Sequence, residues 1–137
     1  SRDQAAGHSA LDGVARTLPA LKRASKLGQR AATVGFDWSN AEGARDKVAE
    51  ELSELDDARA DGSADAISEE LGDLLLSVAN LARHLGVDAE QALGAANRKF
   101  EQRFRGMETA AAKAGEALTE LDSEALEALW QAEKIAP

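Results

Sequence analysis

The sequence predicts an all-α fold, a bundle of helices, from three observations. The 137 residues include two prolines and no tyrosine, and alanine, leucine, glutamate and arginine are abundant, which favours helices. No stretch of four or more residues alternates between apolar and polar side chains as a strand would. Apolar residues instead recur three and four positions apart, which places them on one face of a helix. A chain of this length has room for one domain of ordinary size.

The first residues are not expected to belong to the bundle. Residues 1–16 are polar and contain glycine, so we interpret them as a flexible tail or linker before a helical domain over residues 17–137. The first helix is expected to start near Thr17, because Pro19 is favoured in a first helical turn. It is expected to end at Gly35, since glycine readily takes the left-handed conformation.

A second helix is expected after the loop that contains Phe36 and Trp38. Ser39 followed by Glu42 matches a capping box, in which each side chain bonds the other residue's backbone amide. We expect this helix to run to about Arg59. The apolar residues expected to point inward are Ala44, Val48, Leu52 and Leu55.

A third helix should follow the Asp-Gly-Ser turn at residues 61–63. It is expected over residues 64–85, with Gly86 closing it. Its apolar residues, spaced alternately four and three apart, are Ile67, Leu71, Leu74, Val78, Leu81 and Leu85. Because the turn is short, the second and third helices should be antiparallel neighbours.

Two further helices are expected in the C-terminal part of the chain. Asp88 with Gln91 matches the start of a fourth helix, and Asp122 or Ser123 starts a short fifth one. Their apolar residues are Ala92, Ala96, Phe100, Phe104 and Met107 in the fourth helix and Leu126, Leu129 and Trp130 in the fifth. Outside the central hairpin the chain offers few large apolar side chains, so we expect its core to be completed by homodimerisation.

Composition excludes several classes of site and partner. The chain has 16 basic and 25 acidic residues, a net charge of −9, whereas duplex binding usually needs a basic excess, so no nucleic-acid partner is expected. The absence of cysteine excludes disulfides, thiolate zinc sites and cysteine nucleophiles. No apolar run reaches about 18 residues, so no membrane partner and a cytoplasmic location are expected. Because Met107 is the only methionine, we expect the chain to be a fragment of a longer product.

Four carboxylates of the central hairpin are expected to converge. Each residue of a helix is rotated by 100° from the last, so Glu51 and Glu54 flank the apolar stripe of the second helix on one side. Glu70 and Asp73 flank the stripe of the third helix on the same rotational side. Glu54 and Glu70 each lie eight residues from Gly62, and Glu51 and Asp73 each lie eleven. In an antiparallel pair these side chains therefore meet at one level.

Crowded carboxylates repel one another, and their pKa values rise unless a cation binds between them. Mg²⁺ prefers oxygen ligands, so the sequence predicts a magnesium site, for which Mn²⁺ is a possible substitute. An ordinary solvated acidic face is the alternative for either helix alone. The acids of the two helices, however, lie on the same side of their apolar stripes and at the same distance from the turn, which favours a metal site. A di-iron carboxylate site is discounted because it needs a Glu-x-x-His pair, and neither His8 nor His84 belongs to one.

A basic counterpart lies on the fourth helix. Lys99 and Arg103 are four residues apart and share a face, and Lys47 lies beside the acids of the second helix. A polyphosphate bound to Mg²⁺ on one side would take cations such as these on the other. The alternative is that the cations balance nearby acids such as Glu101. Trp130 can stack on a nucleobase, but its apolar neighbours favour a structural role.

The acidic motifs resemble those of the MazG family of all-α nucleoside triphosphate pyrophosphohydrolases. That family's EExxE and ExxD signatures read here as residues 50–54 and 70–73. The surrounding sequence extends the resemblance over most of the chain, in the segments LDGVARTLPAL, GFDW, KVAEELSEL, EELGDLLLSVANLARHLGVD, NRKFEQRF and LEALW. These segments resemble the C-terminal half of two-repeat bacterial MazG proteins. Ala15 departs from the pattern, since relatives often carry proline there, but it lies in the expected linker.

The resemblance implies hydrolysis of a nucleoside triphosphate to the monophosphate and pyrophosphate with Mg²⁺, and a dimeric or tetrameric assembly. It implies these metal ligands: Glu51, Glu54, Glu70 and Asp73. It also implies nucleotide contacts from residues 47–51, which include Lys47, Glu50 and Glu51, and from Lys99, Arg103 and Trp130.

A carboxylate that is not committed to the metal can activate the attacking water, and Glu50 is the candidate catalytic residue. A non-catalytic helical dimerisation or interaction module is the competing hypothesis, and the intact set of four carboxylates argues against it. A pyrophosphatase specialised for one damaged or deoxy nucleotide would share the same chemistry.

Overall fold

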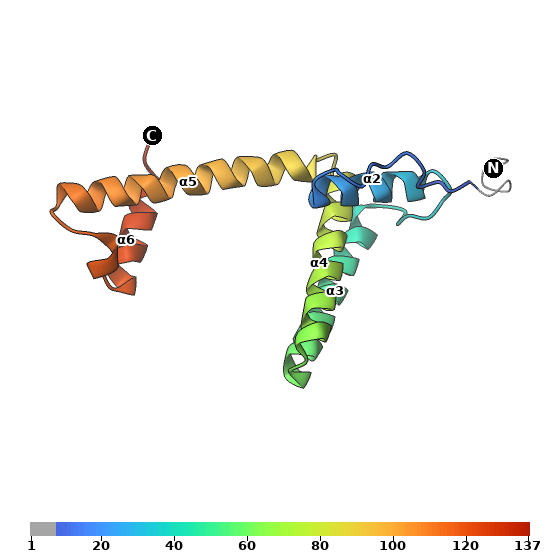
Figure 1. The fold of residues 1–137 in the computed structure, drawn as a ribbon, viewed down its shortest axis with the longest axis horizontal. Coiled ribbons are helices and arrows are strands. Elements are labelled where there is room, and N and C mark those ends of the chain that lie inside the picture. The colour runs from blue at the N-terminus through green and yellow to red at the C-terminus, as the bar shows by residue number, and fades with distance from the viewer. Residues whose placement is uncertain (1–7) are drawn as a thin grey trace. The chain divides into compact units, whose positions relative to one another are not determined.

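The computed structural model describes residues 8–137, and its regular secondary structure in that range consists of helices, with no strand (Figure 1). The elements are α2 (Ala20–Ala32), α3 (Ala41–Asp61), α4 (Ala64–His84), α5 (Ala89–Lys113), the 3₁₀ turn η1 (Leu118–Glu120) and α6 (Ser123–Lys134). The all-α prediction is confirmed. Of the expected tail, residues 1–7 lie outside the described part, and residues 8–19 contain turns but no helix. No helix among the described residues is long and apolar enough to cross a membrane.

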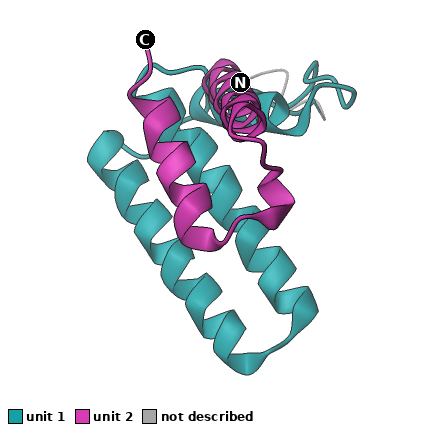
Figure 2. Cartoon of the chain, turned by 90° about the vertical axis from the view of Figure 1, so that its left-hand side faces the viewer, with its two compact units in different colours: residues 1–90 teal, residues 91–137 magenta. Residues whose placement is uncertain are grey.

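The chain divides into two compact units, residues 1–90 and residues 91–137 (Figure 2). Unit 1 contains α2, α3 and α4, and unit 2 contains nearly all of α5 together with η1 and α6. The boundary falls near the start of α5, and each unit is described by itself below.

The helix ends follow local capping chemistry. Gly62 ends α3 in the left-handed conformation, at φ 74°, and the Ser63 hydroxyl caps α4 by accepting a hydrogen bond from the Ala66 amide. Asp122 caps α6 in the same way, by accepting from the Ala125 amide. These ends agree with the sequence-based expectation, apart from α3 running two residues beyond Arg59.

Two expected helix starts are wrong by one to three residues. The cap of α3 is Asn40, whose side chain accepts from the Gly43 amide, and not Ser39. Asparagine caps as well as serine, and the extended backbone of Asn40 places its side chain for the bond. The helix α2 begins at Ala20 rather than near Thr17, because the backbone of Pro19 is still extended, with ψ 141°.

In unit 1, α3 and α4 pack side by side along their lengths, and α2 packs on α4 (Figure 1). The buried residues of the α3–α4 hairpin are small apart from one glutamate: Ala44, Glu51, Ala58, Ser77 and Ala79. Small side chains allow two helices to approach closely, and the larger Leu55 and Leu74 are only half-buried. The α2–α4 contact is also close, since a Cβ on Gly28 would overlap the Asn80 amide.

Several residues predicted to point inward are exposed in the single chain. Leu52 is 50% exposed, Leu71 45% and Leu85 61%, and Val78 lies in the same range. Leu75 and Leu76, outside the predicted stripe, are exposed as well. The prediction is wrong for these residues, because small side chains and Glu51 occupy the buried positions of the hairpin. The hairpin therefore presents an uncovered apolar face to solvent.

Candidate metal and nucleotide site

The structure brings three of the four predicted metal ligands together. One carboxylate oxygen from each of Glu51 on α3 and Glu70 and Asp73 on α4 lies within 4.8 Å of the others. Glu51 is 5% exposed, Glu70 is half-buried and Asp73 is exposed, so the cluster extends from the hairpin interior to the surface. Glu51 and Asp73 each lie eleven residues from Gly62, which places them at one level, and Glu70 lies one turn of α4 before Asp73. Glu51 is buried rather than at the flank of the interface.

Lys47 lies beside this cluster, one turn before Glu51. Its Nζ lies 3.0 Å from Glu51 Oε1 and 3.3 Å from Glu50 Oε1. The Glu51 hydrogen bond outweighs the effect of partial burial and, together with Glu50, raises the pKa of Lys47 above its usual value. Lys47 is therefore firmly protonated and neutralises part of the acidic charge.

Two carboxylate oxygens of the cluster are buried without a partner. Glu51 Oε2 and Glu70 Oε2 have no hydrogen-bond partner in the part of the chain that the structure describes. An uncompensated buried carboxylate oxygen is costly, because it has lost its water and gained nothing in return. Glu51 and Glu70 belong to the group that brings one carboxylate oxygen each together with one from Asp73, so the donor set fits a hard divalent cation.

Glu54, the fourth predicted ligand, is exposed and lies outside this three-residue group. The negative charge of Glu51 raises the pKa of Glu54, with desolvation and Glu70 acting in the same direction. Glu54 is thus close enough to feel the negative charge of the cluster, but its carboxylate does not belong to the group of three. Glu50, the candidate catalytic residue, is exposed and forms an ion pair with Lys47.

The other predicted nucleotide contacts belong to unit 2. The guanidinium of Arg103 lies 5.8 Å from the centre of the Trp130 ring, and Phe100 packs on the same indole at 5.6 Å. Lys99 is exposed. Glu101 pairs with Arg105 at 3.3 Å, and neither Lys99 nor Arg103 forms an ion pair within residues 8–137. These two cations are thus not balanced by Glu101, the alternative that the sequence left open.

Sequence reasoning missed an ion-pair network in the loop before α3. Both oxygens of Asp37 accept hydrogen bonds from Arg83, at 2.7 and 3.0 Å, and His84 Nε2 lies 2.8 Å from Asp37 Oδ1. The Arg83 hydrogen bond holds the pKa of Asp37 well below its usual value against partial burial, and His84 adds to the effect. His84 is therefore half-buried beside an acid and not a simple helix-end residue. The Gly-Phe-Asp-Trp segment was the available signal, since it places an acid between two aromatic residues.

Comparison with known proteins agrees with this geometry. Residues 40–106 match the MazG nucleotide pyrophosphohydrolase domain. A nucleoside triphosphate pyrophosphohydrolase of Escherichia coli K12 is 48% identical over 132 residues, which is 95% of this chain and 50% of that protein. The nucleoside triphosphate pyrophosphohydrolase/pyrophosphatase MazG of Thermotoga maritima is 44% identical over 117 residues, 85% of this chain and 45% of that protein.

The chain spans about half the length of the curated relatives that it matches. The matched segment contains the whole carboxylate cluster, Lys47 and the two cations of α5. With its helical hairpin, its two acidic motifs and these relatives, the chain belongs to the MazG nucleotide pyrophosphohydrolase family.

Proposed function

We propose that this chain hydrolyses nucleoside triphosphates to the monophosphate and pyrophosphate with Mg²⁺ as cofactor. The observation that carries the proposal is the carboxylate cluster with its two buried, unpartnered oxygens, on Glu51 and Glu70. A purely structural role does not account for these oxygens, because a buried unpaired carboxylate destabilises a fold. The family, and the activity for which the Escherichia coli relative is named, support the same chemistry.

Glu51, Glu70 and Asp73 would hold the metal, with Glu54 as the fourth ligand. Mn²⁺, which also takes carboxylate ligands, is the expected substitute. When bound, the cation supplies positive charge that polarises the phosphoryl oxygens and neutralises charge on the leaving group. Charge repulsion between Glu51 and Glu54 favours cation binding at this place, because a cation relieves it.

Glu50 is the candidate general base. A water attacks the α-phosphorus and gives its proton to the Glu50 carboxylate, and the bond from that phosphorus to the bridging oxygen breaks. Pyrophosphate leaves with the bond's electron pair. Lys47 orients Glu50 through their 3.3 Å contact and offers its charge to the phosphates. Lys47, Glu50 and Glu51 are thus proposed nucleotide contacts of unit 1.

Lys99, Arg103 and Trp130 are the proposed nucleotide contacts of unit 2. Lys99 and Arg103 are free of ion pairs within the described residues and suit phosphate oxygens. The indole of Trp130 offers a face for a base or sugar beside the Arg103 guanidinium.

A homodimer is the proposed assembly, and a cytoplasmic location is the proposed setting. Exposed leucines and Val78 along the α3–α4 hairpin form an apolar face that a second copy would cover. The same face is what a non-catalytic interaction module would use. An interaction module, however, does not explain the unpartnered oxygens of Glu51 and Glu70.

Product analysis tests the proposed activity. The chain is incubated with each common nucleoside triphosphate and Mg²⁺, and the products are separated by anion-exchange chromatography. Monophosphate and pyrophosphate in equal amounts are expected. Diphosphate and orthophosphate would mean attack at the γ-phosphorus, and an absence of turnover with every substrate would favour the interaction module.

A further inference from the structure

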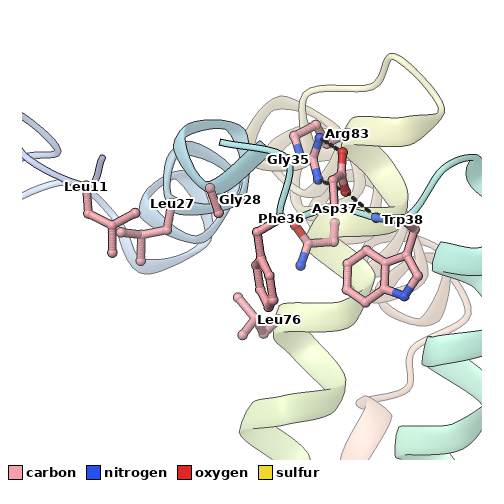
Figure 3. A pocket seen from close by; sticks show the side chains of 11 residues that line it. Leu11, Leu27, Gly28, Gly35, Phe36, Asp37, Trp38, Leu76 and Arg83 are labelled. Carbon is pink, nitrogen blue, oxygen red and sulfur yellow. Dashed lines mark hydrogen bonds and ion pairs between the residues drawn. The ribbon is translucent and has the colours of Figure 1, made fainter. Parts of the chain in front are cut away.

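The helix α2 carries an exposed row of basic side chains. Lys22, Lys26 and Arg30 are exposed and follow one another at intervals of four residues, so neighbours in this basic row lie about 6 Å apart along the helix. The opposite side of α2 packs on α4, and its Leu27 and Gly28 line an apolar pocket that α4 also lines (Figure 3). The basic row therefore faces away from α4.

The charge of this segment is opposite to that of the whole chain. Residues 13–36 contain five of the 16 basic residues and none of the 25 acidic ones. Within residues 8–137, none of the three cations in the basic row forms an ion pair. Like charges four residues apart destabilise a helix, so an anion bound along the row would relieve repulsion.

Two hollows border the basic row. One of about 490 Å³ lies beside the loop between α4 and α5, and one of about 470 Å³ lies beside the loop before α2. Lys26 and Gln29 line both, so the hollows are neighbours. Their walls also include apolar side chains, namely Val14, Leu18 and Val87. The surface thus offers apolar contacts next to its charges.

Two further charged residues line the first hollow. Both terminal nitrogens of Arg83 bind the Asp37 carboxylate, so this cation is already paired (Figure 3). Asp88 is the single acid among the residues that line either hollow, and Lys22 and Lys26 outnumber it in the same hollow. The hollow therefore remains suited to an anion.

A short acidic protein segment fits this surface. Alternate residues of an extended peptide lie about 6.6–6.8 Å apart, which is close to the spacing of the basic row. Carboxylates at alternate positions can therefore pair with successive cations, and apolar side chains between them can reach the hollows. Electrostatic complementarity of this kind gives specificity and speeds association.

Two other polyanions fit the surface less well. Single-stranded nucleic acid is held by aromatic side chains on which its bases stack, and no residue that lines either hollow is aromatic. An amphipathic helix binds a membrane by burying its apolar side in the lipid, but the apolar side of α2 packs on α4.

We infer that the basic row of α2 and its two hollows dock an acidic segment of a partner protein, whose carboxylates pair with Lys22, Lys26 and Arg30. This surface contains none of the proposed metal or nucleotide contacts. The inference therefore does not depend on the proposed function.

A titration followed by NMR is the first test. A capped peptide of alternating glutamate and leucine is added to the isotope-labelled chain without metal or nucleotide. The same peptide with glutamine in place of glutamate is the control ligand. Shifts of the backbone amides of α2 and of the loop before it are expected with the glutamate peptide alone. No shifts, or shifts confined to the basic residues 98–105 of α5, would overturn the inference.

A charge-reversed variant is the second test. Lys22→Glu combined with Lys26→Glu should raise the Kd of the glutamate peptide about tenfold or more, the scale of losing two exposed ion pairs. Lys113→Glu combined with Lys134→Glu, at two exposed lysines of unit 2, changes the net charge equally and should leave the Kd nearly unchanged. Melting temperatures check that both variants fold, and Lys22→Gln with Lys26→Gln should show a smaller loss of the same sign. An equal loss in the Lys113 and Lys134 variant would overturn the inference, because binding would then follow net charge alone.

The same variants separate the other occupants. Oligothymidylate and phosphatidylglycerol vesicles are titrated in place of the peptide. If either binds more tightly than the peptide and loses affinity in the Lys22 and Lys26 variant, the occupant is a nucleic acid or a lipid surface and the inference is wrong. A change of oligomeric state in that variant, measured by light scattering, would assign the surface to a second copy of the chain, with the same consequence.

Discussion

Lys47 Nζ lies 3.0 Å from Glu51 Oε1, whereas the other oxygen of the same carboxylate is buried without a partner. Lys47 thus neutralises one side of a buried acid and leaves the other side for a cation. We expect Lys47→Met to destabilise the metal-free chain by about 1–3 kcal/mol, because Glu51 then loses its partner. Melting temperature without metal measures the effect, and Mg²⁺ should restore more stability to this variant than to wild type. Lys22→Met, at an exposed lysine of α2, is the control. An equal loss in both variants would mean that the Lys47 contact contributes nothing.

Glu54→Gln removes a charge from the crowded acids without changing the shape of the side chain. The metal-free chain should keep or gain stability, because repulsion with Glu51 is relieved. Mg²⁺ affinity and single-turnover rate should both fall, by about 10- to 100-fold or more. The matched control is Glu69→Gln, an exposed glutamate of α4 that lies outside the cluster. A normal rate in Glu54→Gln would remove Glu54 from the ligand set.

Lys99→Ala should separate nucleotide binding from metal binding. Lys99 is exposed, so the fold should change by no more than about 0.5 kcal/mol. We expect KM for the nucleotide to rise while Mg²⁺ affinity, measured by calorimetry without nucleotide, stays the same. Lys113→Ala, at the other end of α5, is the control. If Lys99→Ala lowers metal affinity and leaves KM unaltered, its proposed role is refuted.

The contact of Asp37 with Arg83 and His84 should make stability depend on pH in the acid range. The pKa of Asp37 is lower in the folded chain than its usual 3.8, so the ion pair stabilises the fold above that value. This contribution is lost as pH falls from about 4 toward the lowered pKa. Asp37→Asn should cost about 1 kcal/mol at neutral pH. Urea unfolding of both chains from pH 7 to pH 3 should show the difference shrinking below pH 4. A difference that stays constant over this range would contradict the assignment.

The exposed face of the α3–α4 hairpin should mediate the proposed dimer. Leu75 is 57% exposed in the single chain, and burying a leucine stabilises an interface by about 2 kcal/mol. Leu75→Glu should therefore raise the dimer dissociation constant about thirtyfold or more, because a buried glutamate also loses its hydration. Light scattering over a dilution series measures it, with Ser68→Glu, at an exposed polar site of α4, as the control. A wild-type chain that is monomeric and active at micromolar concentration would rule the dimer out.

The helices were predictable from sequence because their signals are local. Gly62 ends one helix through its backbone conformation, and Ser63 starts the next through its side chain. The level of each acidic residue along the hairpin then follows from its distance in sequence from that turn. The predicted start of α3 was wrong by one residue because Ser39 and Asn40 are adjacent and cap equally well.

The burial of Glu51 and the exposure of Leu52 were not predictable from periodicity. A helical pattern predicts that leucine is interior and that glutamate lies at the edge of the interface, whereas the buried residues of α3 are Ala44, Glu51 and Ala58. The close packing of α2 on α4 was not predictable for a different reason, because Gly28 and Asn80, which meet there, are more than fifty residues apart in the chain.

Ala44, Glu51 and Ala58 are spaced by sevens, so the one buried carboxylate lies between two buried methyl groups on the same face of α3. Small side chains at these two positions allow α3 to approach a neighbouring helix closely on the face that carries Glu51. Mg²⁺ requires oxygens at about 2.0–2.1 Å, and Ca²⁺ accepts about 2.3–2.6 Å with more ligands. A bulkier side chain at Ala58 would force the helices apart, and the widened cluster would discriminate less against the larger ion. We therefore expect the ion selectivity of the proposed site to depend on the small side chains of the hairpin as well as on the carboxylates.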